Sequence, residues 1–169
     1  MVYLGHNVSV SEPGPAVVNV TFQAEGAVRL LSNLAHTPFV FRGVQVASAE
    51  GLIQGMKEEN PVRQGRIFQL SGYESQRASS KRRNARVREA GCVWFAGAAI
   101  RFPSDEYFAL VEDAIGEKFR QNPQALAALV ATRGAQLIHD TGAKPHPGSA
   151  LPGERFIAIL GRIRDRASH

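Results

Sequence analysis

Residues 48–57 read Ser-Ala-Glu-Gly-Leu-Ile-Gln-Gly-Met-Lys, and this segment organises our interpretation of the whole chain. Serine is a favourable N-cap, so Ser48 predicts that a helix begins directly after it. Glu50, Gln54 and Lys57 follow at spacings that place their side chains on one face of that helix. The apolar residues of the segment fall mainly on the other side and predict packing against a core. The polar face, which carries an acid, an amide and an amine, therefore meets either solvent or a cleft.

The composition predicts one compact domain with a substantial core. The chain has 169 residues, of which 44% are hydrophobic and 21% are charged. This length and apolar content fit a single folding unit. Residues 1–16 contain glycines and prolines with little periodicity, so we expect a loose leader there. Residues 17–169 are expected to form the domain.

Charge and cysteine content limit the classes of partner. The chain has 20 lysines and arginines against 15 acidic residues, a formal net charge of +5, which favours ligands that carry phosphate. The single cysteine, Cys92, excludes an internal disulfide, and the histidines show no metal spacing, so we expect neither a metal nor a cofactor. No apolar run reaches the roughly 18 residues that cross a bilayer. We therefore expect no membrane partner and a cytoplasmic location.

Hydrophobic periodicity and turn residues predict an α+β fold that is predominantly helical, with a small N-terminal β element. A β-branched run from Val17 predicts a strand, and residues 39–41 and 44–46 predict a hairpin around Arg42-Gly43. About five helices are predicted, after Ser48 and over residues 74–90, 104–121, 123–130 and 156–163. Residues 142–153 are rich in proline and glycine and predict a loop that covers a cleft beside the 48–57 helix.

Each conspicuous feature also has a structural interpretation. The stripe that begins at Glu50 fits the solvated face of an amphipathic helix as well as a functional site. Residues 74–90 are the most basic part of the chain, and they suit either a solvated face or contacts with phosphate. Trp94 suits either the core or a substrate contact. The chain contains no recognised phosphate loop, serine-nucleophile turn or catalytic cysteine signature.

Short motifs in a fixed order surround the 48–57 segment. They are Leu31-Ser32-Asn33-Leu34, Pro38-Phe39, Gly43, Ser48-Ala49-Glu50, Gln54 and Lys57, followed by Lys118-Phe119, Gln121-Asn122, Leu129-x-x-Thr132 and Leu137. Together they resemble the NADAR, or YbiA-like, family from about Phe22 to Arg164. The chain departs from many members at Ser79-Ser80, where they have Gly-Arg, and at His146-Pro147-Gly148, where they have an aromatic-Trp-Gly segment.

The resemblance implies a YbiA-like fold and hydrolysis of the N-glycosidic bond between a ribose and a base or amine. It implies Glu50 as an acid or base and Lys57 as a covalent or electrostatic catalyst. Such roles suit the residue types, because the leaving base needs a proton and a lysine with a lowered pKa can attack the sugar C1. The candidate substrate-binding residues are Asn33, Gln54, Ser48, Arg77, Lys81, Arg82 and Trp94.

Two substrate classes follow from the resemblance. One is ADP-ribose attached to guanine in DNA, and the other is the phosphorylated ribosylamino-pyrimidine intermediates of riboflavin synthesis. The positive net charge favours the first, because basic surfaces supply sequence-independent affinity for phosphate. A non-catalytic sensor of ADP-ribose or another nucleotide, and a plain nucleic-acid-binding domain, are the alternatives from other classes of function. The sequence leaves the oligomeric state open.

Overall fold

The structure, a computed structural model, describes residues 14–167. Helices dominate this part of the chain, and its strands form three two-stranded sheets. The predicted α+β fold with predominant helix is therefore confirmed. The leader expected over residues 1–16 lies almost wholly outside the described residues and stays a prediction.

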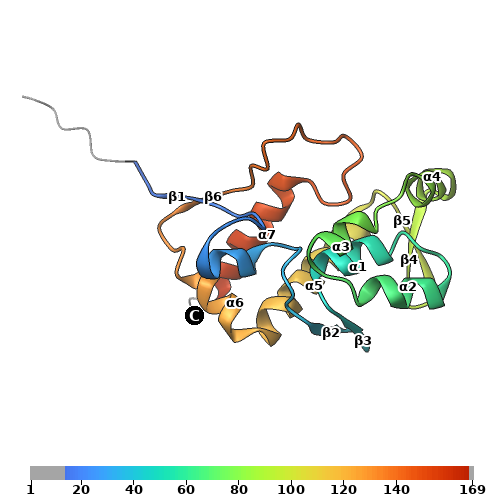
Figure 1. Cartoon of the computed structure of the whole chain (residues 1–169), viewed down its shortest axis with the longest axis horizontal. Helices are drawn as coiled ribbons and strands as arrows, with labels where there is room; N and C mark the ends of the chain where they lie inside the picture. Colours follow the sequence, from blue (N-terminus) through green and yellow to red (C-terminus); the bar gives the residue numbers. More distant parts are fainter. Residues whose placement is uncertain (1–13, 168–169) are drawn as a thin grey trace, which may run out of the picture.

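Each sheet is a single pair of strands. The first strand, β1 (Val17–Asn19), pairs in parallel with β6 (Gln136–Ile138). The two hairpins are antiparallel, β2 (Phe39–Phe41) with β3 (Val44–Val46) and β4 (Cys92–Phe95) with β5 (Ala98–Arg101). The predicted hairpin turn is confirmed, since Arg42 and Gly43 have φ of 48° and 81°, as a two-residue hairpin turn requires. In Figure 1 the three sheets lie apart, at the left, the lower edge and the right of the molecule.

Helices fill the space between these sheets. They are the 3-10 helix η1 (Gly26–Leu31) and the α-helices α1 (Ala49–Gly55), α2 (Pro61–Phe68), α3 (Gly72–Arg77), α4 (Lys81–Ala90), α5 (Asp105–Gln121), α6 (Pro123–Val130) and α7 (Gly153–Arg166). The predicted N-cap of α1 is confirmed, because Ser48 Oγ accepts a hydrogen bond from the Gly51 N–H at 2.9 Å. Ser104 caps α5 in the same way. Within residues 14–167 no helix has both the length and the apolar character that crossing a membrane demands.

Three sequence predictions need correction. The helix expected over residues 74–90 is two helices, α3 and α4, because Ser80 Oγ accepts from the Arg83 N–H and starts a new helix. Helix α2 was missed, since α1 already ends at Gly55 and Pro61 begins a new helix, with Asn60 as its N-cap. Strand β6 was missed because its partner, β1, is remote in sequence.

One hydrophobic core joins α1 to α5, α6 and α7. Its most deeply buried large side chains include Leu52, Met56, Ile115, Phe119, Leu129 and Leu160. Figure 1 shows α1 at the centre of the molecule with α5 running behind it. Most residues of α1 are buried, so the helix is enclosed and does not lie on the surface.

Two glycines allow α1 to pack closely against α2 and the residues after it. A Cβ at Gly51 would lie 2.5 Å from the carbonyl oxygen of Leu70. A Cβ at Gly55 would collide with the ring of Phe68. The close approach of these elements therefore depends on the absence of side chains at both positions.

The substitution Gly51→Ala is expected to lower the free energy of unfolding by about 1–3 kcal/mol, the usual cost of overpacking. The clash involves a backbone carbonyl, which cannot rotate away as the end of a flexible side chain can. Gly65→Ala is the matched control, because a Cβ at that helical position meets nothing within 4 Å. Alanine favours helix over glycine, so the control should be as stable as the natural chain or more so. Denaturant unfolding of both variants measures the difference, and an unchanged Gly51→Ala variant would contradict the packing argument.

Candidate active site

The polar stripe of α1 is enclosed by protein. Gln54 is only 7% exposed, and its Nε2 donates a hydrogen bond to Glu50 Oε1 at 2.8 Å. Lys57 lies in the turn after the helix, where its backbone N–H donates to the Gln54 carbonyl. Glu50 and Lys57 are both partly exposed. The stripe is therefore not the solvated face that an ordinary amphipathic helix would present.

Burial dominates the electrostatics of Glu50. It raises the pKa of the carboxyl group, while the Gln54 hydrogen bond and the charges of Lys57 and His139 act in the opposite direction. Tyr107, which is almost fully buried, has a pKa raised by its own burial and by the negative charge of Glu50. A carboxyl group with a raised pKa keeps its proton to a higher pH than usual and is therefore a better general acid.

The pKa of Lys57 is shifted in the opposite direction, below its ordinary value. Burial lowers the pKa of its amine, and the positive charge of Arg83 lowers it further, although Glu50 opposes both effects. An amine with a lowered pKa is neutral more often and is therefore a better nucleophile. Glu50 and Lys57 thus form an acid and amine pair of the kind found at catalytic sites.

Asn33 is held beside this pair by backbone contacts. The Glu50 N–H donates to the Asn33 carbonyl at 2.9 Å. Lys118, which is 0% exposed, donates from Nζ to the carbonyls of Leu31 at 3.3 Å and Ser32 at 2.8 Å. The predicted site residue is therefore fixed from both sides, by α1 and by α5.

Buried polar atoms without partners gather around the same residues. Among residues 14–167, the buried side-chain atoms with no hydrogen-bond partner are Asn33 Oδ1, Gln54 Oε1 and Arg83 Nε. Such an atom typically costs about 1–3 kcal/mol when it stays unpaired. Native proteins rarely leave buried polar groups unsatisfied, so this concentration in one place indicates a ligand site.

The other predicted site residues lie at the edge of this group, with Ser48 as the N-cap of α1 and the Trp94 N–H donating to the Met56 carbonyl at 2.8 Å. Ser48 is 0% exposed, and its hydroxyl donates to the Leu70 carbonyl while it caps α1, so this hydroxyl anchors the helix. Trp94 lies in β4 and is half-buried against the core. Arg77, Lys81 and Arg82 are exposed at the end of α3 and in the first turn of α4. The structure therefore brings together Asn33, Glu50, Gln54 and Lys57, but not the whole predicted set.

Two residues of the site were not predicted. Arg83 approaches Lys57 from α4, and its position has a signal in the sequence, because it precedes Val87, the buried residue of α4, by one helical turn. His139 follows β6, its Nδ1 lies 2.6 Å from the Val20 carbonyl, and its charge acts on Glu50. Only the pairing of β1 with β6 brings His139 to this place, and no local pattern predicts that pairing.

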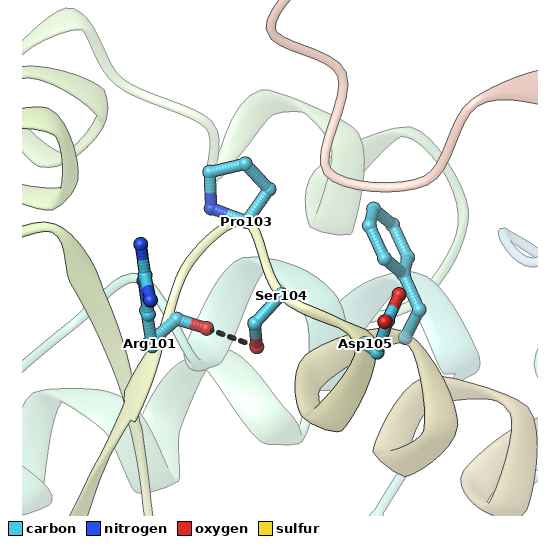
Figure 2. Close-up of a pocket in the computed structure, with 5 residues that line it drawn as sticks. Arg101, Pro103, Ser104 and Asp105 are labelled. Carbon is cyan, nitrogen blue, oxygen red and sulfur yellow. Dashed lines mark hydrogen bonds between the residues drawn. The ribbon is translucent and has the colours of Figure 1, made fainter.

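The protein also has surface hollows at the start of α5, of about 410 Å³ and 330 Å³. Figure 2 shows the first, in which Arg101 and Asp105 flank Pro103 and Ser104. The Ser104 hydroxyl donates to the Arg101 carbonyl at 2.6 Å, and Arg101 and Asp105 are exposed. These solvated groups offer no desolvated acid and amine, so we place the candidate active site at α1. Within residues 14–167 no cluster of His, Cys, Asp and Glu suits a metal ion.

Comparison with known proteins identifies relatives of the chain. Residues 26–165 match the family described as Bacteriophage protein GP30.3. The chain belongs to this family. A relative from Enterobacteria phage T4, described as an uncharacterized 17.1 kDa protein in the Gp30-rIII intergenic region, is 35% identical over 136 residues, which are 80% of this chain and 88% of the relative.

A solved structure is similar in fold. The NMR structure of the Escherichia coli protein YbiA aligns with a TM-score of 0.60, covering 92% of this chain and 87% of YbiA. Its sequence identity with this chain is 19%, a level at which the likeness concerns the fold. The predicted YbiA-like fold is thereby confirmed.

The burial of Lys118 predicts a pH-dependent stability. Burial lowers the pKa of its amine from 10.5 to about 7 in the folded chain. The neutral amine keeps two N–H groups, enough for the carbonyls of Leu31 and Ser32. Between these two pKa values the unfolded chain binds more protons than the folded chain. The contribution of Lys118 to the free energy of unfolding therefore rises with pH, by at most about 1.4 kcal/mol per pH unit.

The variant Lys118→Met lacks this titration in both states. The free energy of unfolding of the natural chain minus that of the variant should therefore rise as the pH increases from about 7 towards 10.5. Denaturant titrations across that range measure it, with the exposed Lys144→Met as the control, for which the difference should stay constant. A constant difference for Lys118→Met would contradict the argument.

Proposed function

We propose that this protein is an N-glycosidase that hydrolyses the bond between a ribose and a base, with ADP-ribose attached to guanine in DNA as its substrate. The observation that carries the proposal is the enclosed pair of Glu50 and Lys57, whose pKa values burial moves toward each other. An acid on α1 and a nucleophilic amine in the turn that follows it are the groups that this reaction needs. The resemblance to the NADAR family supports the same chemistry.

In the proposed reaction the neutral amine of Lys57 forms a bond to the ribose C1 while the bond from C1 to the base breaks. The leaving base takes the proton of Glu50, and the new secondary ammonium returns a proton to the Glu50 carboxylate. Glu50 then protonates the ring oxygen as the ring opens, which leaves a protonated imine between Lys57 and C1. Water adds to C1 and gives a proton to Glu50, and the sugar leaves as the amine is restored. Base and sugar are the only products, and water is the only reactant consumed besides the substrate.

The amides of the site suit the positioning of a ribose. Gln54 uses its Nε2 to hold Glu50, so its buried Oε1 remains to accept a hydrogen bond from a sugar hydroxyl. Asn33 Oδ1 is likewise buried and without a partner. Two acceptors beside the acid and the amine therefore match the donors that ribose hydroxyls provide.

The choice of DNA rests on charge. The net charge is +5, and Arg77, Lys81 and Arg82 form an exposed basic group at the end of α3 and the start of α4. Such a group would attract the phosphate backbone without reading its sequence.

The second candidate substrate is a phosphorylated ribosylamino-pyrimidine, favoured by Arg83, because one guanidinium in the site is enough for one phosphate. We place the activity in the cytoplasm, where a free cysteine such as Cys92 stays reduced.

Glu50→Gln and Lys57→Ala are each expected to slow base release by at least about 100-fold, because one removes the acid and the other the nucleophile. The assay follows loss of ADP-ribose from an ADP-ribosyl-guanine oligonucleotide and, in parallel, cleavage of the phosphorylated ribosylamine. The exposed Lys144→Ala is the control and should retain full activity. Near-natural rates in either site variant would overturn the assignment.

Borohydride added during turnover tests the covalent step of the same prediction. It should reduce the imine and leave a ribose-derived mass on the peptide that contains Lys57. Lys57→Ala should give no adduct. Failure to trap an adduct on the natural chain, despite turnover, would remove the covalent step and leave Lys57 an electrostatic role.

The rate should have a bell-shaped dependence on pH. Activity needs a protonated Glu50, whose pKa is raised above 4.5, and a neutral Lys57, whose pKa is lowered below 10.5. The rate therefore falls on the alkaline side as Glu50 loses its proton and on the acid side as Lys57 gains one. The acid limb and the alkaline limb of the profile should both lie between pH 4.5 and pH 10.5, and kcat/KM measured across that range tests this. A profile without an acid limb would contradict the need for a neutral amine.

A further inference from the structure

The side chain of Arg83 lies at the site. It forms no hydrogen bond with any of the residues that the structure describes. It is 24% exposed, and its Nε is buried and has no partner. Its nearest acidic atom is Glu58 Oε2, at 3.9 Å from Nη1, which is too far for a hydrogen bond. The N–H groups of this guanidinium therefore remain available to a ligand.

Two neighbouring arginines are hydrogen-bonded to carboxylates, in contrast to Arg83, whose Nε is buried and without a partner. Arg63 Nη2 donates to Glu58 Oε1 at 3.1 Å, and Arg86 binds Glu59 through two nitrogens. Glu58 Oε1 also accepts the Asn60 N–H at 3.0 Å. Glu58 thus uses Oε1 for these partners, while its Oε2 faces Arg83 beyond hydrogen-bond distance.

The buried atoms without hydrogen-bond partners indicate which chemical groups a ligand would carry. Asn33 Oδ1 and Gln54 Oε1 accept hydrogen bonds and match hydroxyl groups, whereas Arg83 Nε donates and matches an anion. Glu50 forms hydrogen bonds with Asn33 and Gln54, and the charges of Glu50 and Arg83 both act on the pKa of Lys57. The acceptors are thus linked to Lys57 through Glu50, and the donor acts on it directly, so one sugar phosphate could offer its hydroxyls to the acceptors and its phosphate to the donor.

We propose that Arg83 binds a phosphate group of the sugar whose hydroxyls face Asn33 and Gln54, so that the site selects phosphorylated over unphosphorylated ribose. This inference deepens the proposed function and rests on it for the reaction, but not for the binding. The planar guanidinium suits the task, because it can hold two phosphate oxygens through parallel N–H groups. The exposed Arg77, Lys81 and Arg82 are then left for the remote parts of a larger substrate.

The test compares binding of ribose 5-phosphate and ribose to the full chain by titration calorimetry. The natural chain should bind ribose 5-phosphate at least about 10-fold more tightly, as a charge-assisted hydrogen bond allows. Arg83→Gln should lose this preference and keep its affinity for ribose. Arg88→Gln, an exposed position on the same helix, removes the same charge and should leave the preference intact.

Two results would overturn the inference. One is an undiminished preference for ribose 5-phosphate in Arg83→Gln, and the other is an equal loss in Arg88→Gln, which would indicate net charge alone. If Arg83→Gln fails to fold, as judged by its thermal unfolding, Arg83→Lys replaces it. That variant keeps the charge without the planar fork and should retain only part of the preference.

Turnover separates this inference from the proposed function. A preference that depends on Arg83, in a chain that releases no base from any ribosylated substrate, would uphold the phosphate site and refute the N-glycosidase. Base release by Arg83→Gln with the natural preference for phosphorylated substrates would uphold the N-glycosidase and refute the phosphate site.

Discussion

The buried amine of Lys118 is the contact on which the arrangement of the site depends. It crosses from α5 to the carbonyls of Leu31 and Ser32, and within residues 14–167 it forms no ion pair. Isolated burial of an ammonium is costly, and the protein offsets the cost through the lowered pKa of this group. The two carbonyls in return gain partners in a place that water does not reach. A costly group is therefore kept where it fixes the end of η1 and the start of the irregular segment that follows.

Residues at the C-terminal end of α5 fix the next part of the same backbone segment through further hydrogen bonds. Asn122 Nδ2 donates to the Pro38 carbonyl at 3.0 Å, and Gln121 exchanges hydrogen bonds with both backbone groups of Val40. The motif residues from Lys118 to Asn122 thus hold the chain from η1 to β2 against α5. That chain in turn presents Asn33, whose carbonyl accepts the Glu50 N–H. The two blocks of the YbiA-like motif pattern are physically one unit, in which the later block positions the earlier one.

Local signals account for what the sequence predicts well. The caps Ser48 and Ser104, the Arg42-Gly43 turn and the position of Pro123 each specify an element through contacts within a few residues, and the structure confirms those elements. The sequence likewise predicted the polar stripe of α1. It did not predict that the stripe is buried, because α5 and other elements remote in sequence cover it. His139 joins the site through a parallel strand pair, and Arg83 through a helix that starts later than its charge pattern suggests. Residues placed by distant contacts are therefore those that sequence reasoning misses.

Glu50 and Lys57 would form an ordinary ion pair in water, because each would favour the charged form of the other. At this site burial is the largest cause acting on both pKa values, and it disfavours both charges. A phosphate on Arg83 would cancel the positive charge that helps to lower the pKa of Lys57. The same sugar would also exclude water from the partly exposed acid and amine, which strengthens the effect of burial. The exclusion of water by the substrate therefore opposes the loss of that charge in its effect on the pKa of Lys57.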